Sequence, residues 1–186
     1  MQFGCYVQVA SEEVEKIQEI DLCLGTNMKK DIVEIVESYI KADLDEKNYD
    51  KSNIMMDDVF KSKDYCEFGS ITFSENTRAV IKVQDGCDRF CSYCLIPYAR
   101  GRVRSRNPKN VIEEVKKIAN KGFKEVVITG IHVASYGKDF NENDIKLFVE
   151  SKNCHSNLES NKYELIDLLE EINNIEGIER VRLRFY

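Results

Sequence analysis

The chain has 186 residues, of which 42% are hydrophobic, and 33 acidic against 27 basic residues give a net charge of −6. This composition is ordinary for a globular protein, and the absence of any run of 18 apolar residues excludes a transmembrane helix. The first ten residues lack the basic start and the long apolar stretch of a signal peptide, so we expect a cytoplasmic protein without a membrane partner. In a reducing cytoplasm the seven cysteines are better suited to metal or redox chemistry than to disulfides.

Residues 1–40 have the pattern of α/β structure. Ser11 followed by two glutamates predicts a helix start, and residues 21–25 (DLCLG) read as a short strand. Thr26 or Asn27 can then cap a second helix, whose apolar positions recur at helical spacing: Ile32, Ile35, Val36, Tyr39 and Ile40. Residues 41–75 are rich in Asp, Lys, Asn and Ser and show no clear period. They predict a linker or crossing segment without regular secondary structure.

From residue 76 onward strands and helices alternate. A strand is expected at 79–83 (AVIKV), and Asn107 followed by Pro108 predicts the start of a helix that ends at Gly122. The next elements are a strand at 125–129 closed by Gly130, a helix around 165–172 and a strand at 180–185. This order predicts an α/β fold with a parallel sheet built from right-handed crossovers. Residues 139–161 are polar and rich in Asn, and they read as a surface insertion.

Charge is segregated along the chain. Residues 78–124 hold twelve Lys or Arg against four Asp or Glu, whereas residues 138–180 hold five against eleven. Such asymmetry suggests that a polyanion meets the basic stretch, although basic residues that merely solvate helix faces would give the same count. Within that stretch Arg100, Arg102, Arg104 and Arg106 alternate in ARGRVRSR. On an extended segment they would share one side, where they could hold RNA phosphates or a carboxylate of a cofactor, or could form a solvated edge.

The strongest motif is a set of three cysteines in one loop directly after a predicted strand. Cys87, Cys91 and Cys94 have the spacing C-x3-C-x2-C. Three thiolates can hold three irons of a cubane iron–sulfur cluster, which leaves the fourth iron open to chelation by a small molecule. A structural zinc site is the alternative, but the other cysteines offer no second pair at the spacing that zinc usually requires.

Four blocks of sequence carry a family resemblance. Residues 77–106, which contain the three cysteines and Tyr93 before the last of them, resemble the start of the radical domain of radical S-adenosylmethionine (SAM) methylthiotransferases. Residues 126–137 (VVITGIHVASYG) and 164–183 are similar to the branch of that family that modifies threonylcarbamoyladenosine in tRNA. Residues 4–40 resemble the end of the family's N-terminal domain.

The resemblance implies an enzyme with definite cofactors. Cys87, Cys91 and Cys94 would bind the 4Fe-4S cluster that chelates SAM, and Tyr93 and Gly130 would contact that cofactor. Reductive cleavage of SAM would activate C2 of the adenine of N6-threonylcarbamoyladenosine-37, which would receive a methylthio group. The sulfur would come from a second cluster held by three N-terminal cysteines, of which only Cys5 has a match here. The expected partners are tRNA, a reducing electron donor and a sulfur source.

The resemblance also implies a domain plan. Residues 1–40 would be the C-terminal part of the N-terminal α/β methylthiotransferase domain, 41–75 a linker and 76–186 the N-terminal half of the radical SAM domain. That half would form the first βα units of a partial TIM-type barrel. With three such units and one matched ligand of the second cluster, the chain is expected to be a fragment that is inactive by itself.

Several alternatives stay open at this level. The substrate could instead be isopentenyladenosine in tRNA or an aspartate of a ribosomal protein. The chain could also be a non-catalytic remnant that binds metal or RNA. His132 could be structural or functional, and Tyr136 could stack on an RNA base or pack in the core. Cys154 and His155, in the predicted insertion, receive no role.

Overall fold

The computed structural model describes residues 1–44, 54–67, 78–149 and 162–185. They form two compact units. Unit 1 contains Met1–Cys66 and Asp88–Arg102, and unit 2 contains Glu67–Cys87 and Val103–Tyr186. The chain therefore passes from unit 2 to unit 1 directly after Cys87 and returns after Arg102. The domain boundaries expected from the family resemblance stay a prediction.

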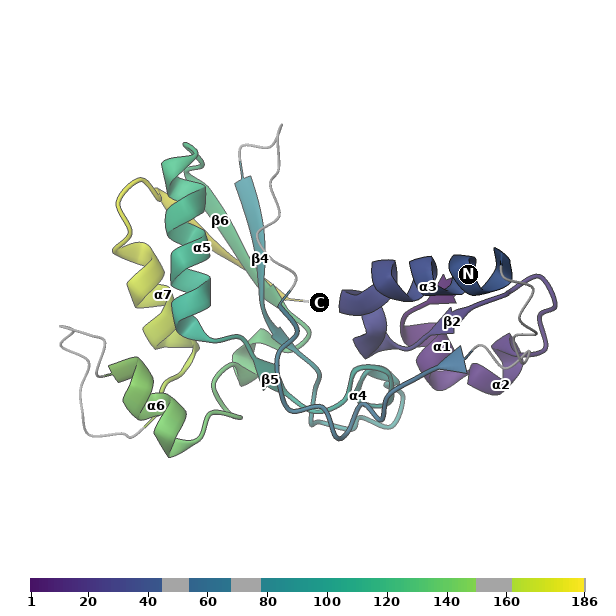
Figure 1. Cartoon of the computed structure of the whole chain (residues 1–186). Coiled ribbons are helices and arrows are strands. Elements are labelled where there is room, and N and C mark those ends of the chain that lie inside the picture. The colour runs from purple at the N-terminus through teal and green to yellow at the C-terminus, as the bar shows by residue number, and fades with distance from the viewer. Residues whose placement is uncertain (45–53, 68–77, 150–161, 186) are drawn as a thin grey trace. The chain divides into compact units, whose positions relative to one another are not determined.

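Unit 1 is built on a small parallel sheet with the strand order β1-β2-β3 (Figure 1). Three residues, Val7, Val14 and Cys23, form its buried apolar cluster, against which Ile20 and Ile54 pack. Its strands are β1 (Gln2–Phe3), β2 (Cys23–Leu24) and β3 (Ile54–Met55). Its helices are α1 (Cys5–Val9), α2 (Ser11–Val14), the 3-10 helix η1 (Thr26–Asp31), α3 (Ile32–Leu44) and α4 (Ile96–Arg100).

The predictions for unit 1 are partly confirmed. The strand expected at 21–25 is β2, but β3 lies within the segment predicted to have no regular structure. This two-residue strand has no local signal, because its pairing with β2 and not its own sequence pattern defines it. The predicted caps are wrong as well. Ser11 is the first residue of α2 and Ala10 precedes it as the cap, while Thr26 opens η1, which leads into α3.

Unit 2 is built on an open four-stranded sheet with the strand order β5-β4-β6-β7. The strands β4, β6 and β7 are parallel, as predicted, whereas β5 is an antiparallel edge strand that the pattern did not indicate. The helices α5 and α7 lie over one face of this sheet (Figure 1). The strands are β4 (Arg78–Asp85), β5 (Arg104–Ser105), β6 (Glu125–Gly130) and β7 (Arg180–Arg184). The helical segments are α5 (Pro108–Asn120), η2 (Val133–Ser135), α6 (Glu142–Val149) and α7 (Leu165–Asn173).

Helix α5 shows how local sequence and burial agree in unit 2. The Asn107 side chain caps it by accepting a hydrogen bond from the backbone N–H of Lys109 at 2.9 Å, and Pro108 occupies the first turn. Its apolar face packs against the sheet in the buried core of unit 2. The core members include Val111, Val115, Ala79, Ile81, Val83, Val126, Ile128, Leu168 and Ile172. The predicted helix, both neighbouring strands and the α7 stripe are thus confirmed.

The expected α/β class is confirmed, but no closed barrel is seen among the described residues. Within that part of the chain β7 pairs only with β6, and most of its residues are exposed. No described helix is long and apolar enough to cross a membrane.

The segment predicted as a surface insertion is folded where it is described. Asp139 accepts hydrogen bonds from the backbone N–H and the hydroxyl of Ser105, at 2.7 and 2.5 Å. Ile145 of α6 is buried in the main core. Tertiary contacts therefore order residues 139–145 although their sequence is locally polar, and an insertion at 139–161 stays a prediction. Cys154 and His155 lie outside the described residues.

Candidate metal centre after strand β4

The end of β4 leads the chain into the first cysteine along a fixed path. The Asp85 carboxylate accepts a hydrogen bond from the backbone N–H of Gly86 at 2.9 Å, and it pairs with Lys82 Nζ at 2.6 Å. Gly86 has a φ of 70°, a left-handed conformation that residues with side chains adopt only with strain. The backbone direction into Cys87 is therefore set by a charge pair, a hydrogen bond and a glycine.

A glutamine that the sequence analysis did not identify lies beneath this turn. The Gln84 side chain is fully buried, and its Nε2 donates to the carbonyl oxygens of Asp85 and Gly86 at 2.6 and 2.7 Å. Its Oε1 accepts a hydrogen bond from the backbone N–H of His132 at 2.7 Å. The sequence does contain a signal for this residue, because the polar Gln84 follows the mostly apolar run AVIKV directly before the turn at Gly86.

The three cysteines of the motif carry free thiols. Cys87 and Cys94 are half-buried and Cys91 is exposed. The backbone N–H of Cys94 donates to the carbonyl of Cys91 at 2.9 Å, so a tight turn joins the last two. This donor set fits an iron–sulfur cluster, because three thiols in an accessible loop are what such a cluster requires. Among the described residues no three Cys, His, Asp or Glu side chains are gathered as they would be around a metal ion.

Aromatic contacts hold the residues between the cysteines within unit 1. Phe90 has a φ of 45°, and its ring stacks on Phe60 and meets Tyr98 edge-on, with centroid distances of 6.3 and 5.8 Å. The Arg102 guanidinium lies 5.3 Å from the centre of the Phe90 ring and 3.8 Å from the carboxylate of Asp88. Together these contacts support the left-handed backbone at Phe90, which costs free energy in a residue with a side chain.

Tyr93 lies in the same loop with a 90% exposed side chain. A contact between Tyr93 and the cofactor stays a prediction.

The predicted row of four arginines on one side of an extended segment is wrong. Arg100 belongs to helix α4, and Arg102 follows that helix with an exposed side chain. Arg104 is buried in β5, where its guanidinium lies 3.9 Å from Asp85, and Arg106 is buried just beyond that strand. Alternation in the sequence predicts a common face only if the backbone is extended throughout, and here Arg100 is still helical and Gly101 has a left-handed φ of 77°.

Arg106 is the centre of an ion-pair network in unit 2. Its guanidinium contacts the carboxylates of Glu67 at 2.7 Å and Glu114 at 2.5 Å. Burial alone would lower the pKa of Arg106, but hydrogen bonds and charge from these two carboxylates raise the pKa above its ordinary value. The guanidinium is thus committed to internal partners, which argues against a phosphate contact there.

The residues after β6 have mainly structural surroundings. Gly130 is buried opposite Gln84 in the strand pairing, and a Cβ atom there would lie 2.9 Å from Gln84 Oε1. His132 Nδ1 lies 2.7 Å from the hydroxyl of Ser135. Tyr136 is 1% exposed, and its hydroxyl donates to the carbonyl of Arg106 at 2.8 Å, while burial raises its pKa. Of the two roles weighed for Tyr136, core packing is therefore correct and base stacking is excluded.

The two N-terminal cysteines differ in environment. Cys5 begins α1 and is partly exposed, which leaves its thiol available as a ligand. Cys23 is buried in β2, as expected for a structural cysteine, and burial raises the pKa of its thiol. The role of Cys5 in a second cluster stays a prediction.

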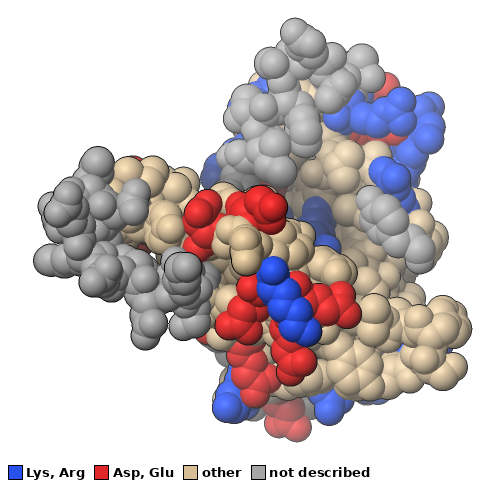
Figure 2. All heavy atoms as spheres, turned by 90° about the vertical axis from the view of Figure 1, so that its right-hand side faces the viewer, with Lys and Arg blue, Asp and Glu red and all other residues tan. Residues whose placement is uncertain are grey.

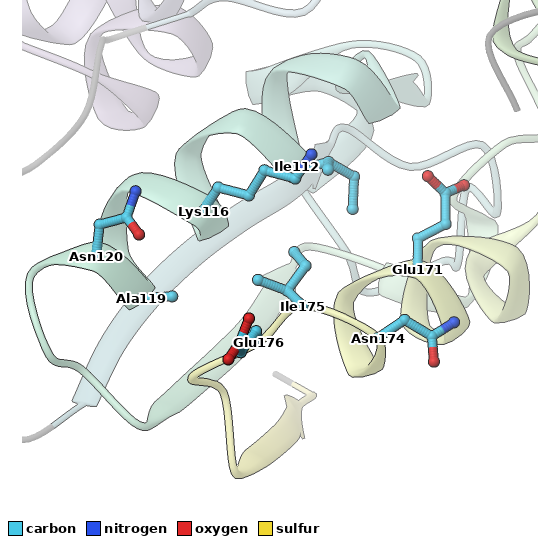
Figure 3. A pocket seen from close by; sticks show the side chains of 8 residues that line it. All are labelled: Ile112, Lys116, Ala119, Asn120, Glu171, Asn174, Ile175 and Glu176. Carbon is cyan, nitrogen blue, oxygen red and sulfur yellow. The ribbon is translucent and has the colours of Figure 1, made fainter.

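Two further features of the surface concern a groove in unit 2 and the distribution of charge. A groove of about 470 Å³ in unit 2 is lined by residues of α5 from Ile112 to Asn120, by Glu171 of α7 and by Asn174, Ile175 and Glu176 just after α7 (Figure 3). The face of the molecule seen in Figure 2 carries a group of Asp and Glu side chains beside Lys and Arg, and it is not a uniformly basic surface.

Comparison with known proteins agrees with this site. The profile described as the radical SAM superfamily matches residues 81–183, a range that contains the cysteine loop and β6 and reaches into β7. The chain belongs to the radical SAM methylthiotransferase family.

The curated relatives differ in the substrate that their names state. The chain is 36% identical, over 97% of its length, to threonylcarbamoyladenosine tRNA methylthiotransferase MtaB of Aquifex aeolicus. It is 32% identical over 96% of its length to tRNA-2-methylthio-N(6)-dimethylallyladenosine synthase of Thermoanaerobacter sp., and 31% identical over 98% to ribosomal protein uS12 methylthiotransferase RimO of Acetivibrio thermocellus. It spans 37%, 33% and 36% of these relatives, about a third of each.

Proposed function

We propose that this chain is the cluster-binding part of a methylthiotransferase that acts on N6-threonylcarbamoyladenosine-37 of tRNA. The observation that carries the proposal is the triplet of free thiols at Cys87, Cys91 and Cys94, placed directly after a strand of a parallel α/β sheet. In parallel α/β folds, catalytic groups gather where the strands end. In this proposal β4, β6 and β7 are the first strands of a partial TIM-type barrel.

The proposed roles follow from the donor types. Cys87, Cys91 and Cys94 hold a 4Fe-4S cluster, and Tyr93 and the backbone of Gly130 contact SAM. When bound, the cluster and SAM supply the one-electron chemistry that activates C2 of the adenine. Cys5 is one ligand of a second cluster that serves sulfur transfer. Arg100 and Arg102 lie beside the loop, where they can hold a phosphate or a carboxylate. The proposed setting is the cytoplasm, with tRNA, an electron donor and a sulfur source as partners.

The choice of substrate rests on a small margin of similarity. The relative named for threonylcarbamoyladenosine is 36% identical, against 32% and 31% for those named for dimethylallyladenosine and ribosomal protein uS12. The block VVITGIHVASYG favours the first of these substrates. A remnant that binds metal or RNA without turnover is the candidate of a different class.

Anaerobic reconstitution of the 186-residue chain tests the metal centre. We expect iron, sulfide and visible absorbance equivalent to one 4Fe-4S cluster per chain, because one complete cysteine triplet is present. Stoichiometric zinc in place of iron would support the structural alternative. Iron for two clusters per chain would contradict the proposal that Cys5 belongs to an incomplete set of ligands for a second cluster.

Mass spectrometry of tRNA tests the substrate. A host that lacks its own methylthiotransferases receives either this chain or a hybrid, in which the chain replaces the matching third of the Aquifex aeolicus relative. We expect the hybrid to restore the 2-methylthio form of threonylcarbamoyladenosine and the chain alone to restore none. The same hybrid with Cys91→Ala is the control. Methylthiolation of isopentenyladenosine in the same tRNA, or of ribosomal protein uS12 in a parallel mass-spectrometric measurement of that protein, would assign a different substrate.

A further inference from the structure

The Gln84 side chain makes three hydrogen bonds inside unit 2. Both hydrogens of Nε2 are directed to backbone carbonyls, of Asp85 and of Gly86, and Oε1 accepts the N–H of His132. The side chain has no exposed surface. A buried amide that is hydrogen-bonded through both its nitrogen and its oxygen is held rigidly, whereas loss of one partner would leave polar groups without hydrogen bonds in the interior.

These three hydrogen bonds join the ends of two neighbouring strands. Gly86 precedes the ligand Cys87, and its N–H and carbonyl are both held, by Asp85 and by Gln84 respectively. His132 follows Gly130, at the end of the parallel strand β6. The pairing of β4 with β6 shifts register between Lys82 and Gln84, which places Gln84 opposite Gly130. A Cβ atom at Gly130 would lie 2.9 Å from both Cβ and Oε1 of Gln84, so this packing requires glycine.

We propose that Gln84 is a positioning residue for the cofactors, which fixes the backbone before Cys87 relative to the backbone after Gly130. It touches neither the cluster nor SAM. It acts through Gly86 on the first thiolate and through His132 on the turn that follows β6. This inference rests on the proposed cluster, and it adds a residue that neither the cysteine motif nor the predicted cofactor contacts include.

The test compares Gln84→Met with a matched control in the reconstituted full chain. Methionine keeps the length and flexibility of the side chain but removes its hydrogen bonds. Gln8→Met is the control, because the Gln8 amide bridges backbone in the same way in unit 1. Its Nε2 donates to Asp57 at 3.1 Å and its Oε1 accepts from Thr26 at 3.0 Å.

Two measurements report on how the cluster and SAM are positioned, and not only on whether the chain is folded. The first is the rate of iron loss to a chelator, measured well below the unfolding midpoint of each variant. The second is the SAM concentration needed to change the electron paramagnetic resonance spectrum of the reduced cluster. For Gln84→Met we expect iron loss to be about tenfold faster and the SAM requirement about tenfold higher, since a buried network loses several hydrogen bonds. For Gln8→Met we expect both values to stay within about twofold of the unsubstituted chain.

The outcomes separate this inference from the proposed function. If the unsubstituted chain takes up no cluster, the proposed function fails. If the cluster forms and Gln84→Met matches the unsubstituted chain, or if Gln8→Met is equally impaired, the positioning role is wrong. Hydrogen exchange of the unsubstituted chain covers the case in which Gln84→Met does not fold. The His132 amide should then exchange as slowly as the amides of β6, and exchange at the rate of an exposed loop would overturn the proposal.

Discussion

The sheet of unit 2 and the cysteine-bearing segment 88–102 of unit 1 are built in opposite ways. Strands β4 and β6 contribute the fully buried side chains of Val83, Val126 and Ile128. The segment instead exposes Cys91, and the side chains of Tyr93 and Leu95 are 90% and 63% exposed. Burial of apolar surface stabilises the sheet, whereas reactive thiols must stay accessible to a cluster and a substrate. Substitutions in the two regions should therefore separate stability from cluster binding.

The clearest separation of cluster binding from stability is expected at the cysteines. Cys87→Ala, Cys91→Ala or Cys94→Ala should abolish the visible absorbance of the reconstituted cluster, because two thiolates cannot replace three. Cys5→Ala should leave it unchanged. Thermal unfolding of the metal-free chain should be nearly the same in all four variants, since none of these side chains belongs to the described core clusters. Retained absorbance in any of the first three variants would contradict the ligand assignment.

The largest effect on stability alone is expected at Arg106. Arg106→Ala leaves the buried carboxylate of Glu114 without its partner, which should cost about 3 kcal/mol in the free energy of unfolding. Urea denaturation of the metal-free chain measures it. Arg102→Ala is the matched control, and it should cost less than about 1 kcal/mol because its side chain is 57% exposed. If the two substitutions lower the free energy of unfolding equally, burial of the Arg106 guanidinium does not determine its contribution to stability.

A smaller effect, confined to unit 1, is expected at Phe90. Phe90→Ala removes the ring contacts with Phe60, Tyr98 and Arg102 and should loosen segment 88–102 by about 1 kcal/mol. Limited proteolysis should then cleave this segment faster. Tyr93→Ala, at the 90% exposed neighbour, should change the cleavage rate little. If both variants are cleaved at the rate of the unsubstituted chain, the aromatic contacts do not order the loop.

The smallest effect concerns RNA. If the chain binds tRNA, Arg102→Ala should flatten the logarithmic dependence of affinity on salt concentration by roughly one unit, the contribution of a single phosphate contact. Arg104→Ala should leave the slope unchanged, because that side chain is 4% exposed. Filter binding or fluorescence anisotropy at several salt concentrations measures both. An unchanged slope with Arg102→Ala would indicate that this side chain serves only the contacts with Phe90 and Asp88.

The regular part of unit 2 could be read from the sequence because local and global preferences agree there. Asn107 and Pro108 set the start of α5, and the spacing of Val111, Val115 and Ile118 gives the face that the core buries. Elements of two residues could not be read in the same way. Strands β3 and β5 exist through their partners β2 and β4, and neither has a pattern long enough to show a period.

The sequence by itself determined the cysteine triplet and the parallel strands β4, β6 and β7, because spacing and periodicity are local properties, and the resemblance of four sequence blocks indicated the family. Only the tertiary structure decided what four alternating arginines and one glutamine do. Arg100 is the last residue of helix α4 whereas Arg104 lies in strand β5, and Arg106 is buried with the carboxylates of Glu67 and Glu114 as partners. Gln84 bonds to the two residues that follow it and also to His132, which lies 48 residues away in the chain. The cost of burying charged and polar groups is offset by partners distant in sequence, and no local pattern reports those partners.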